Sequence, residues 1–135
     1  MSLIKIQVKT GNHKYPIYIG SNISNKLTKI LSENLVNFNQ CLIIADKNVP
    51  KKLVNKIFNT LPKKKISIHY FSSNEKNKSQ KSIDKILTLL LNKNFNRNDC
   101  LISIGGGITG DVSGFAASIF KRGLKFVNIP TTLLS

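Results

Sequence analysis

Hydrophobic and polar residues alternate through the first part of the chain. Residues 3–9 and 15–19 both follow a period of two, which is typical of a strand with one apolar face. Gly11 and Asn12 lie between these two segments, and such residues favour tight turns. The pattern therefore predicts an N-terminal β-hairpin.

Beyond residue 20, short apolar runs take turns with segments whose apolar residues recur at helical spacing. The predicted strands are 41–46, 66–71, 100–105 and 124–130, and the predicted helices are 21–35, 50–60, 79–91 and 109–120. Ser21 or Asn22 is the expected N-cap of the first helix, and Leu35 and Leu91 are expected to face the core. Strands that alternate with helices of this length indicate an α/β fold, in which helices flank a Rossmann-like parallel sheet. We expect one domain over residues 1–135.

The composition supports a folded domain. Hydrophobic residues make up 41% of the 135 residues, enough to bury a core. No apolar run approaches the roughly 20 residues that a membrane span requires, and the first residues lack the pattern of a secretory signal. We expect a cytoplasmic protein with no membrane partner.

The net charge of +15 raises the hypothesis of a nucleic-acid binder. However, the excess is almost entirely lysine, with Arg97 and Arg122 as the two arginines. Aromatic residues do not interleave with the lysines as they would in a base-stacking surface. The lysines stand among asparagines and isoleucines, which share A/T-rich codons, so codon bias is the simpler explanation. We expect no nucleic-acid partner, although attraction of phosphorylated substrates stays open.

The cysteines and histidines give no metal-binding pattern. Cys41 and Cys100 each stand at the head of an apolar strand, which is typical of buried thiols. His13 and His69 are far apart in sequence and lack the spacing of metal ligands.

The most specific feature is a glycine-rich turn between a strand and a helix. Gly105, Gly107 and Gly110 match the G-x-G-x-x-G spacing that seats a pyrophosphate. Without Cβ atoms the backbone approaches a phosphate closely, and the following helix directs its free N–H groups at the anion. A plain tight connection is the alternative. No acid follows Asp111, so ribose contacts are expected from the ends of earlier strands, at Asp46 and Glu75.

Two further positions have alternative interpretations. Arg122 follows the last predicted helix, where it is either a partner of the helix dipole or a bidentate phosphate ligand. Thr131 and Thr132 follow the last strand and are either backbone caps or ligand contacts.

Four segments together resemble the 3-dehydroquinate synthase family of sugar-phosphate cyclases. They are NEKNKS (74–79), GGGITGDVSGFAAS (105–118), KRG (121–123) and IPTTLLS (129–135). The resemblance implies the N-terminal NAD-binding domain of such an enzyme. Family members are carbon–oxygen lyases of the shikimate pathway, which leads to the aromatic amino acids. They use NAD and a divalent metal, zinc or cobalt, to convert 3-deoxy-D-arabino-heptulosonate 7-phosphate into 3-dehydroquinate and phosphate.

The resemblance also implies roles for individual residues. The implied cofactor-binding residues are Asp46, Ser73, Asn74, Glu75, Lys76, Asn77, Lys78, Gly105, Gly106, Gly107, Ile108, Thr109, Gly110, Asp111, Thr131 and Thr132. Residues 73–78 would contact the adenosine side of NAD, and residues 107–111 the pyrophosphate and nicotinamide side. Arg122 would bind the phosphate of the substrate, in the neighbouring subunit of a homodimer.

The sequence departs from the family pattern in two places. Where the family usually has Asp-Gly-Glu, this chain has Ser73, Asn74 and Glu75. The family's helical domain, which carries the metal ligands, would follow residue 135. We therefore expect a truncated chain with no catalytic residues or metal ligands in residues 1–135, and no stand-alone activity. A free-standing nucleotide-binding module without catalysis, or a related sugar-phosphate cyclase, are the alternatives.

Overall fold

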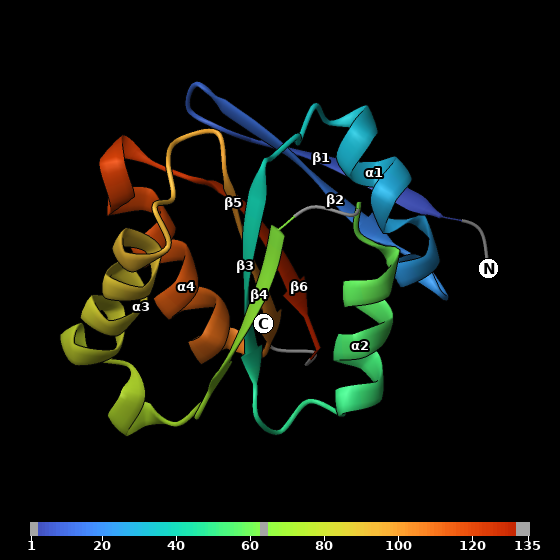
Figure 1. The fold of residues 1–135 in the computed structure, drawn as a ribbon. Coiled ribbons are helices and arrows are strands. Elements are labelled where there is room, and N and C mark those ends of the chain that lie inside the picture. The colour runs from blue at the N-terminus through green and yellow to red at the C-terminus, as the bar shows by residue number, and fades with distance from the viewer. Residues whose placement is uncertain (1–2, 63–64, 132–135) are drawn as a thin grey trace.

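A parallel sheet forms the centre of the molecule. The computed structural model describes residues 3–62 and 65–131. The strands β3 (Gln40–Asp46), β4 (Lys65–Phe71), β5 (Cys100–Gly105) and β6 (Lys125–Pro130) form a four-stranded sheet in the order β4-β3-β5-β6 (Figure 1). All three strand pairs are parallel, which confirms the predicted sheet.

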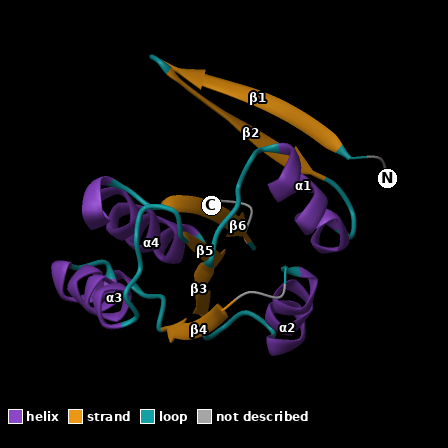
Figure 2. Ribbon diagram, turned by 45° about the horizontal axis from the view of Figure 1, so that its top comes forward, coloured by secondary structure: helices purple, strands orange, loops and turns teal. Residues whose placement is uncertain are grey.

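Helices cover both faces of this sheet. The helices α3 (Gln80–Asn92) and α4 (Gly107–Ile119) lie on one side, and α1 (Leu27–Glu33) and α2 (Lys51–Thr60) lie on the other (Figure 2). Three short 3₁₀ turns, η1 (Ile23–Lys26), η2 (Glu75–Asn77) and η3 (Phe120–Arg122), complete the helical segments of the described residues. The predicted α/β fold is therefore confirmed.

The N-terminal hairpin forms a separate two-stranded sheet. The strands β1 (Ile4–Thr10) and β2 (His13–Ile19) pair antiparallel from Ile4↔Ile19 to Thr10↔His13. Gly11 occupies the turn with a φ of +56°, a value that glycine adopts without steric cost. The hairpin lies apart from the central sheet, beside α1 (Figures 1 and 2). The Asn34 amide donates a hydrogen bond to the Tyr18 hydroxyl at 2.8 Å and fastens the hairpin to the body.

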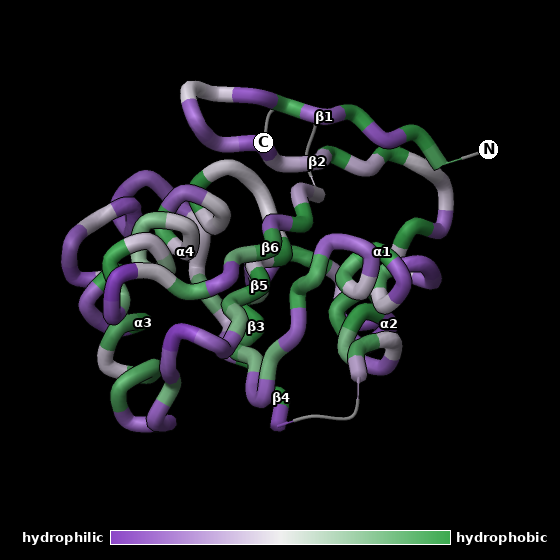
Figure 3. The backbone as a smooth tube through the Cα atoms, turned by 90° about the horizontal axis from the view of Figure 1, so that it is seen from above, coloured by the Kyte–Doolittle hydropathy of each residue, from purple (hydrophilic) through white to green (hydrophobic). Residues whose placement is uncertain are grey.

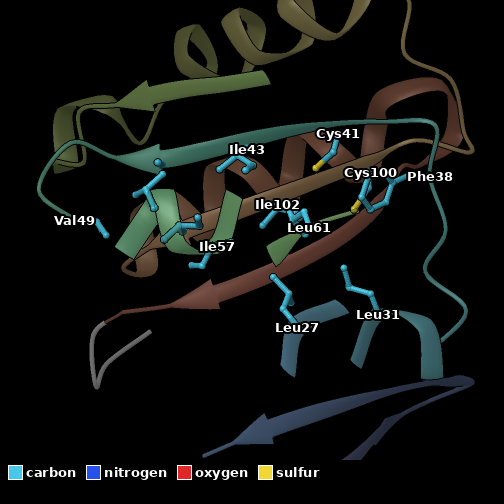
Figure 4. Close-up of a cluster of buried hydrophobic side chains, with 13 residues drawn as sticks. Leu27, Leu31, Phe38, Cys41, Ile43, Val49, Ile57, Leu61, Cys100 and Ile102 are labelled. Atoms are coloured by element: carbon cyan, nitrogen blue, oxygen red, sulfur yellow. The ribbon is translucent and has the colours of Figure 1, made fainter. Parts of the chain in front are cut away.

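Each face of the sheet carries its own apolar cluster. Successive strand residues point to opposite faces, so Ile43 and Ile102 pack toward α1 and α2, whereas Leu42 and Leu101 pack toward α3 and α4. Figure 4 shows the first of these clusters. The tube in Figure 3 is largely green, that is hydrophobic, along the central strands β3 and β5, as expected for strands buried on both faces. Cys41 and Cys100 are free and buried, which confirms that prediction.

The predicted helix 21–35 is shorter in the structure. It divides into η1 and α1 and ends at Glu33. Asn22 precedes η1 with left-handed backbone and makes no side-chain cap, although its carbonyl accepts the N–H of Asn25. Leu35 has a φ of +57° and is 78% exposed, so the prediction that it faces the core is wrong: the chain has already left the helix there.

Two smaller differences concern the other helices. Leu91 is 57% exposed, contrary to the prediction, because Leu90 takes the buried position at that turn. The helix α4 begins at Gly107, two residues before the predicted start. Among the described residues, no helix combines the length and the apolar character that crossing a bilayer requires.

Candidate functional site

The carboxyl ends of all four parallel strands meet at one edge of the sheet. Asp46 pairs with Phe71 across β3 and β4, and Gly105 pairs with Pro130 across β5 and β6. The loops that follow these strands therefore gather at this edge, which is where open parallel sheets bind ligands. Most of the site residues predicted from the sequence lie here.

Gly105 is required by close packing. A Cβ atom at Gly105 would lie 2.9 Å from the Cβ of Asp46 and 2.9 Å from the Oγ1 of Thr109. The turn does not depend on left-handed backbone, because no glycine from 105 to 110 has a positive φ. The first glycine of the motif thus lets the start of α4 lie directly against β3.

Gly110 brings α4 close to the last strand. Its missing Cβ would lie 3.1 Å from the Oδ1 of Asn128 on β6. That same oxygen accepts a hydrogen bond from the Ser103 hydroxyl at 2.7 Å. The third glycine of the motif therefore serves helix–sheet packing, as in dinucleotide-binding turns.

The amino end of α4 has free hydrogen-bond donors. Gly106 is its N-cap and offers no side chain, whereas the Ser79 hydroxyl caps α3 by accepting from the N–H of Ser82. Within α4, the first bond runs from the N–H of Gly110 to the Gly106 carbonyl at 3.0 Å, so the N–H groups of residues 107–109 have no acceptor within the helix. Gly107 is exposed. This end of the helix can bind an anion through backbone N–H groups and the helix dipole.

Buried hydroxyl groups accompany the turn. Thr109 and Ser113 are both fully buried, and their hydroxyl oxygens have no hydrogen-bond partner among the described residues. An unpaired buried hydroxyl is energetically unfavourable, so each of these two groups calls for a partner such as a water or an ion.

Asp46 lies beside the glycine turn at the end of β3. Its side chain is mostly buried, with 8% of the residue exposed. Its Oδ1 accepts the N–H of Asn48 at 2.9 Å, which fixes the orientation of the carboxylate. The N–H of Lys47 bonds to the Phe71 carbonyl at 2.9 Å and holds this turn against the end of β4.

The segment after β4 is organised by two asparagines. The Oδ1 of Asn74 accepts the N–H of Asn77 at 2.9 Å, and the Nδ2 of Asn77 donates to the Ser72 carbonyl at 2.8 Å. Ser73 and Asn77 are half-buried, and the other members of the predicted set, Asn74, Glu75, Lys76 and Lys78, are exposed. Asn74 thus supports a compact turn at the position where the family usually has glycine.

An ion pair joins this segment to α4. The Nζ of Lys78 lies 3.2 Å from the Oδ2 of Asp111. The two residues are 33 positions apart in the sequence and were predicted to serve one cofactor. The structure therefore brings these two predicted segments together.

The remaining predicted residues lie in different places. The N–H of Thr131 bonds to the Gly105 carbonyl at 2.9 Å, so Thr131 stands at the same edge, whereas Thr132 lies outside the described residues. Arg122 lies beyond the far end of α4, and a helix of 13 residues spans about 20 Å. The structure thus does not bring Arg122 to this edge within one chain.

One contributor to the site was missed in the sequence. Asn128 contacts Gly110 and accepts from Ser103, and it thereby positions the first turns of α4. The available signal was a polar residue in the middle of a mostly apolar strand, KFVNIP.

The histidine and metal-site predictions concern other parts of the chain. His69 is half-buried on β4, and burial together with the positive charges of Lys85 and Lys47 lowers its pKa from the ordinary value of 6.5. In residues 3–62 and 65–131, no three His, Cys, Asp or Glu side chains gather as a metal site would require.

Comparison with known sequences gives a consistent family. Residues 68–135 match the family described as 3-dehydroquinate synthase N-terminal. The chain is 64% identical over 135 residues to a 3-dehydroquinate synthase of Pelagibacter ubique, covering all of this chain and 37% of that protein. It is 44% identical to the 3-dehydroquinate synthase of Buchnera aphidicola, covering 96% of this chain and 35% of that protein. The chain thus spans little more than a third of the length of these relatives.

Solved structures share the fold. A crystal structure of 2-deoxy-scyllo-inosose synthase superimposes with a TM-score of 0.84 at 23% identity, over 96% of this chain and 36% of that one. A second structure of that enzyme, complexed with carbaglucose-6-phosphate, NAD+ and Co2+, also gives 0.84, at 22% identity over 95% and 35%. The glycine turn, the Lys78 segment and the end of β6 all fall within the matched residues 68–135. The chain belongs to the 3-dehydroquinate synthase family and corresponds to the N-terminal part of its members.

Proposed function

We propose that this chain supplies the NAD-binding part of a 3-dehydroquinate synthase. The main support is the uncapped amino end of α4 at the carboxyl edge of the sheet, directly behind the Gly105 turn. In this proposal the N–H groups of residues 107–109 hold the pyrophosphate, and the predicted cofactor set surrounds it.

The residues present fit such a cofactor. Pyrophosphate requires donors and room for the backbone to approach, and Gly107 provides both because it is exposed and starts the helix. The backbone N–H of Thr109 adds a donor within this first turn, while its buried hydroxyl packs against Gly105. Lys78 adds positive charge at the same edge, beside Asp111.

The sugar contacts are assigned to acids at the strand ends. The mostly buried Asp46 carboxylate is oriented by Asn48 and has a second oxygen available to accept from a ribose hydroxyl. Glu75 is exposed on η2, at the outer side of the same edge. Thr131 and Thr132 follow β6, where they would close over the cofactor.

In the whole protein we assign the reaction of the family. It converts 3-deoxy-D-arabino-heptulosonate 7-phosphate into 3-dehydroquinate and phosphate in the shikimate pathway of the cytoplasm. Bound NAD supplies transient oxidation of one substrate hydroxyl, and a zinc or cobalt ion would be held by the remaining two thirds of the protein. Arg122, at the opposite end of α4, would bind the substrate phosphate of the neighbouring subunit in a homodimer.

A charge placed at Gly107 tests this proposal. Gly107→Asp puts a carboxylate at the positive end of α4, which favours the helix by about 0.3–1 kcal/mol. The same carboxylate repels a pyrophosphate, so the affinity for NAD+ measured by calorimetry falls at least about tenfold, or about 1.4 kcal/mol. Gly107→Ala adds a side chain without charge and is the matched control.

Gly107→Asp is expected to raise the stability and to lower the affinity for NAD+, so an effect on binding can be told apart from an effect on folding. A variant that loses both stability and affinity indicates damage to the turn, which would leave the pyrophosphate assignment without support. Failure of the folded wild-type chain to bind NAD+ would refute the cofactor role of this chain.

A nucleotide-binding module without catalysis is the second candidate, because the anion-binding end of α4 and the oriented Asp46 carboxylate can serve binding alone. The two candidates differ in chemistry. Phosphate release from the heptulosonate phosphate, after the chain is combined with the C-terminal part of a relative, favours the synthase. NAD+ binding without such complementation favours the module.

A further inference from the structure

The strands β3 and β5 begin with cysteines that face each other. Cys41 pairs with Cys100 in the parallel register of the two strands. Both are free and both are 0% exposed. Adjacent strands are about 4.8 Å apart, which lies within the Cα separation of about 4.4–6.8 Å that a disulfide spans.

The two thiols point to the same side of the sheet. Register partners in a sheet share a face, and both cysteines belong to the cluster under α1 and α2 (Figure 4). Contact with the Cys100 thiol, together with burial, raises the pKa of the Cys41 thiol far above its ordinary value. The native pair is therefore protonated and unreactive, since the thiolate is the reactive form.

Phe38 packs in the same cluster as the cysteine pair and also borders an open hollow. Phe38 belongs to the same cluster as both cysteines and is 6% exposed. It also lines a hollow of about 410 Å³ together with Asn37, Asn39, Asn98 and Lys125. Displacement of Phe38 would connect the thiols with solvent at the amino end of the sheet.

A buried carboxylate holds this end closed. Asp99 is 0% exposed, and its oxygens accept the N–H of Gln40 at 3.1 Å and of Asn96 at 2.9 Å. These bonds tie the start of β3 to the residues before β5. Opening the edge requires breaking them, so access to the thiols is a local unfolding event.

We propose that Cys41 and Cys100 are a latent disulfide site, which a small organic disulfide oxidises when the amino edge of the sheet opens. One cysteine thiolate attacks the small disulfide, forming a mixed disulfide and releasing one small thiol. The second cysteine then attacks that mixed disulfide, forming the Cys41–Cys100 bond and releasing the second small thiol. The two cysteines lose two protons and two electrons, which the two released thiols carry away.

Oxidised glutathione is a suitable probe for this site. The folded chain is incubated with it, with and without urea at a concentration below the unfolding transition, and intact mass is followed. The expected product has lost two hydrogens and yields a peptide that links residues 41 and 100. Urea accelerates its formation several-fold, because urea raises the population of the opened edge.

Variants and unfolding measurements complete the test. Cys41→Ala and Cys100→Ala each keep one thiol, so each is expected to carry a glutathione adduct and no internal link. The cross-linked wild-type chain is expected to unfold at a higher urea concentration than the reduced chain, because the link restricts the unfolded state. Two persistent adducts, a disulfide between chains, or a cross-linked product without native circular dichroism would each overturn the proposal.

Discussion

At the glycine turn, Gly105 is needed for packing, whereas Gly107 lies at the exposed start of α4. Gly105→Ala places a methyl group 2.9 Å from both the Asp46 Cβ and the Thr109 Oγ1. Overpacking of this kind costs about 1–3 kcal/mol, and we expect that loss in the unfolding free energy measured with urea. Gly107→Ala, at the exposed start of α4, is expected to leave the stability unchanged or slightly higher. Equal stability of Gly105→Ala and the wild type would contradict the contact geometry.

We expect His69 to make the stability of the folded chain depend on pH near neutrality. Its pKa is lowered in the folded chain by burial and by Lys85 and Lys47, so below its ordinary value of 6.5 the unfolded chain binds more protons than the folded chain. His69 therefore makes its full contribution to the unfolding free energy above that pH. The unfolding free energy falls as the pH decreases below it. We expect the thermal midpoint to fall from pH 7.5 to about pH 5.5, a range in which histidine titrates.

The variant His69→Gln tests that assignment, because it removes the titrating group and should flatten the pH dependence. His13→Gln removes the exposed histidine of the hairpin and is expected to keep the slope. A slope that persists in His69→Gln would assign it to other groups.

The sequence reveals where glycine is needed but not which contact requires it. The spacing of Gly105, Gly107 and Gly110 predicted a phosphate-binding turn. The partners Asp46 and Asn128 are supplied by β3 and β6, which are distant in sequence and reach the turn only through sheet order. Periodicity describes single elements, so such contacts stay invisible until the topology is known.

At the scale of elements, the ion pair between Lys78 and Asp111 couples the segment after β4 to α4. The pair is 3.2 Å apart with side chains 51% and 64% exposed. Exposed pairs contribute about 0.2–1 kcal/mol, and salt screens them. A double-mutant cycle with Lys78→Ala and Asp111→Ala is expected to show a coupling energy in that range, which declines at high salt.

A second ion pair provides the comparison. Lys29 and Glu33 lie 3.9 Å apart within α1, one turn from each other. Their coupling should affect stability alone, whereas loss of Lys78 should also lower the affinity for NAD+. If loss of either ion pair changed the affinity for NAD+ equally, the Lys78–Asp111 pair would have no specific role in the site.

The sequence pattern predicted the ends of a helix or strand well where the element is buried on both faces or on one face only. The strands β3 and β5 were predicted almost to the residue because continuous apolar runs leave little choice of register. The errors at Leu35 and Leu91 have another cause: both occupy helical spacing at a helix end, where the chain turns away before the position reaches the core.

At the scale of the whole molecule, one group of exposed apolar side chains among the described residues lies together on the hairpin. We define the hairpin outer face by Ile4, Ile6, Tyr15, Ile17 and Ile19, each between 41% and 48% exposed. The pairs Ile4↔Ile19 and Ile6↔Ile17 form a cross-strand ladder on this face, and Tyr18 points from the opposite face to Asn34. A contiguous apolar patch on a strand pair with free edges favours association.

The net charge of +15 opposes that association, so the balance depends on salt. Repulsion between chains is screened within about 10 Å at 0.1 M salt, while the attraction between apolar faces is not. We therefore expect the isolated chain to self-associate more as salt increases, as measured by sedimentation velocity. The double variant Ile6→Thr/Ile17→Thr keeps strand propensity and should remain monomeric, whereas Lys5→Thr/Lys9→Thr changes the opposite face and should associate at lower salt. A salt titration also tests the nucleic-acid hypothesis, because affinity for a polyanion falls steeply as the salt concentration rises, whereas self-association is expected to increase. A wild-type chain that stays monomeric at high salt would show that the hairpin outer face is too weakly apolar to drive contact.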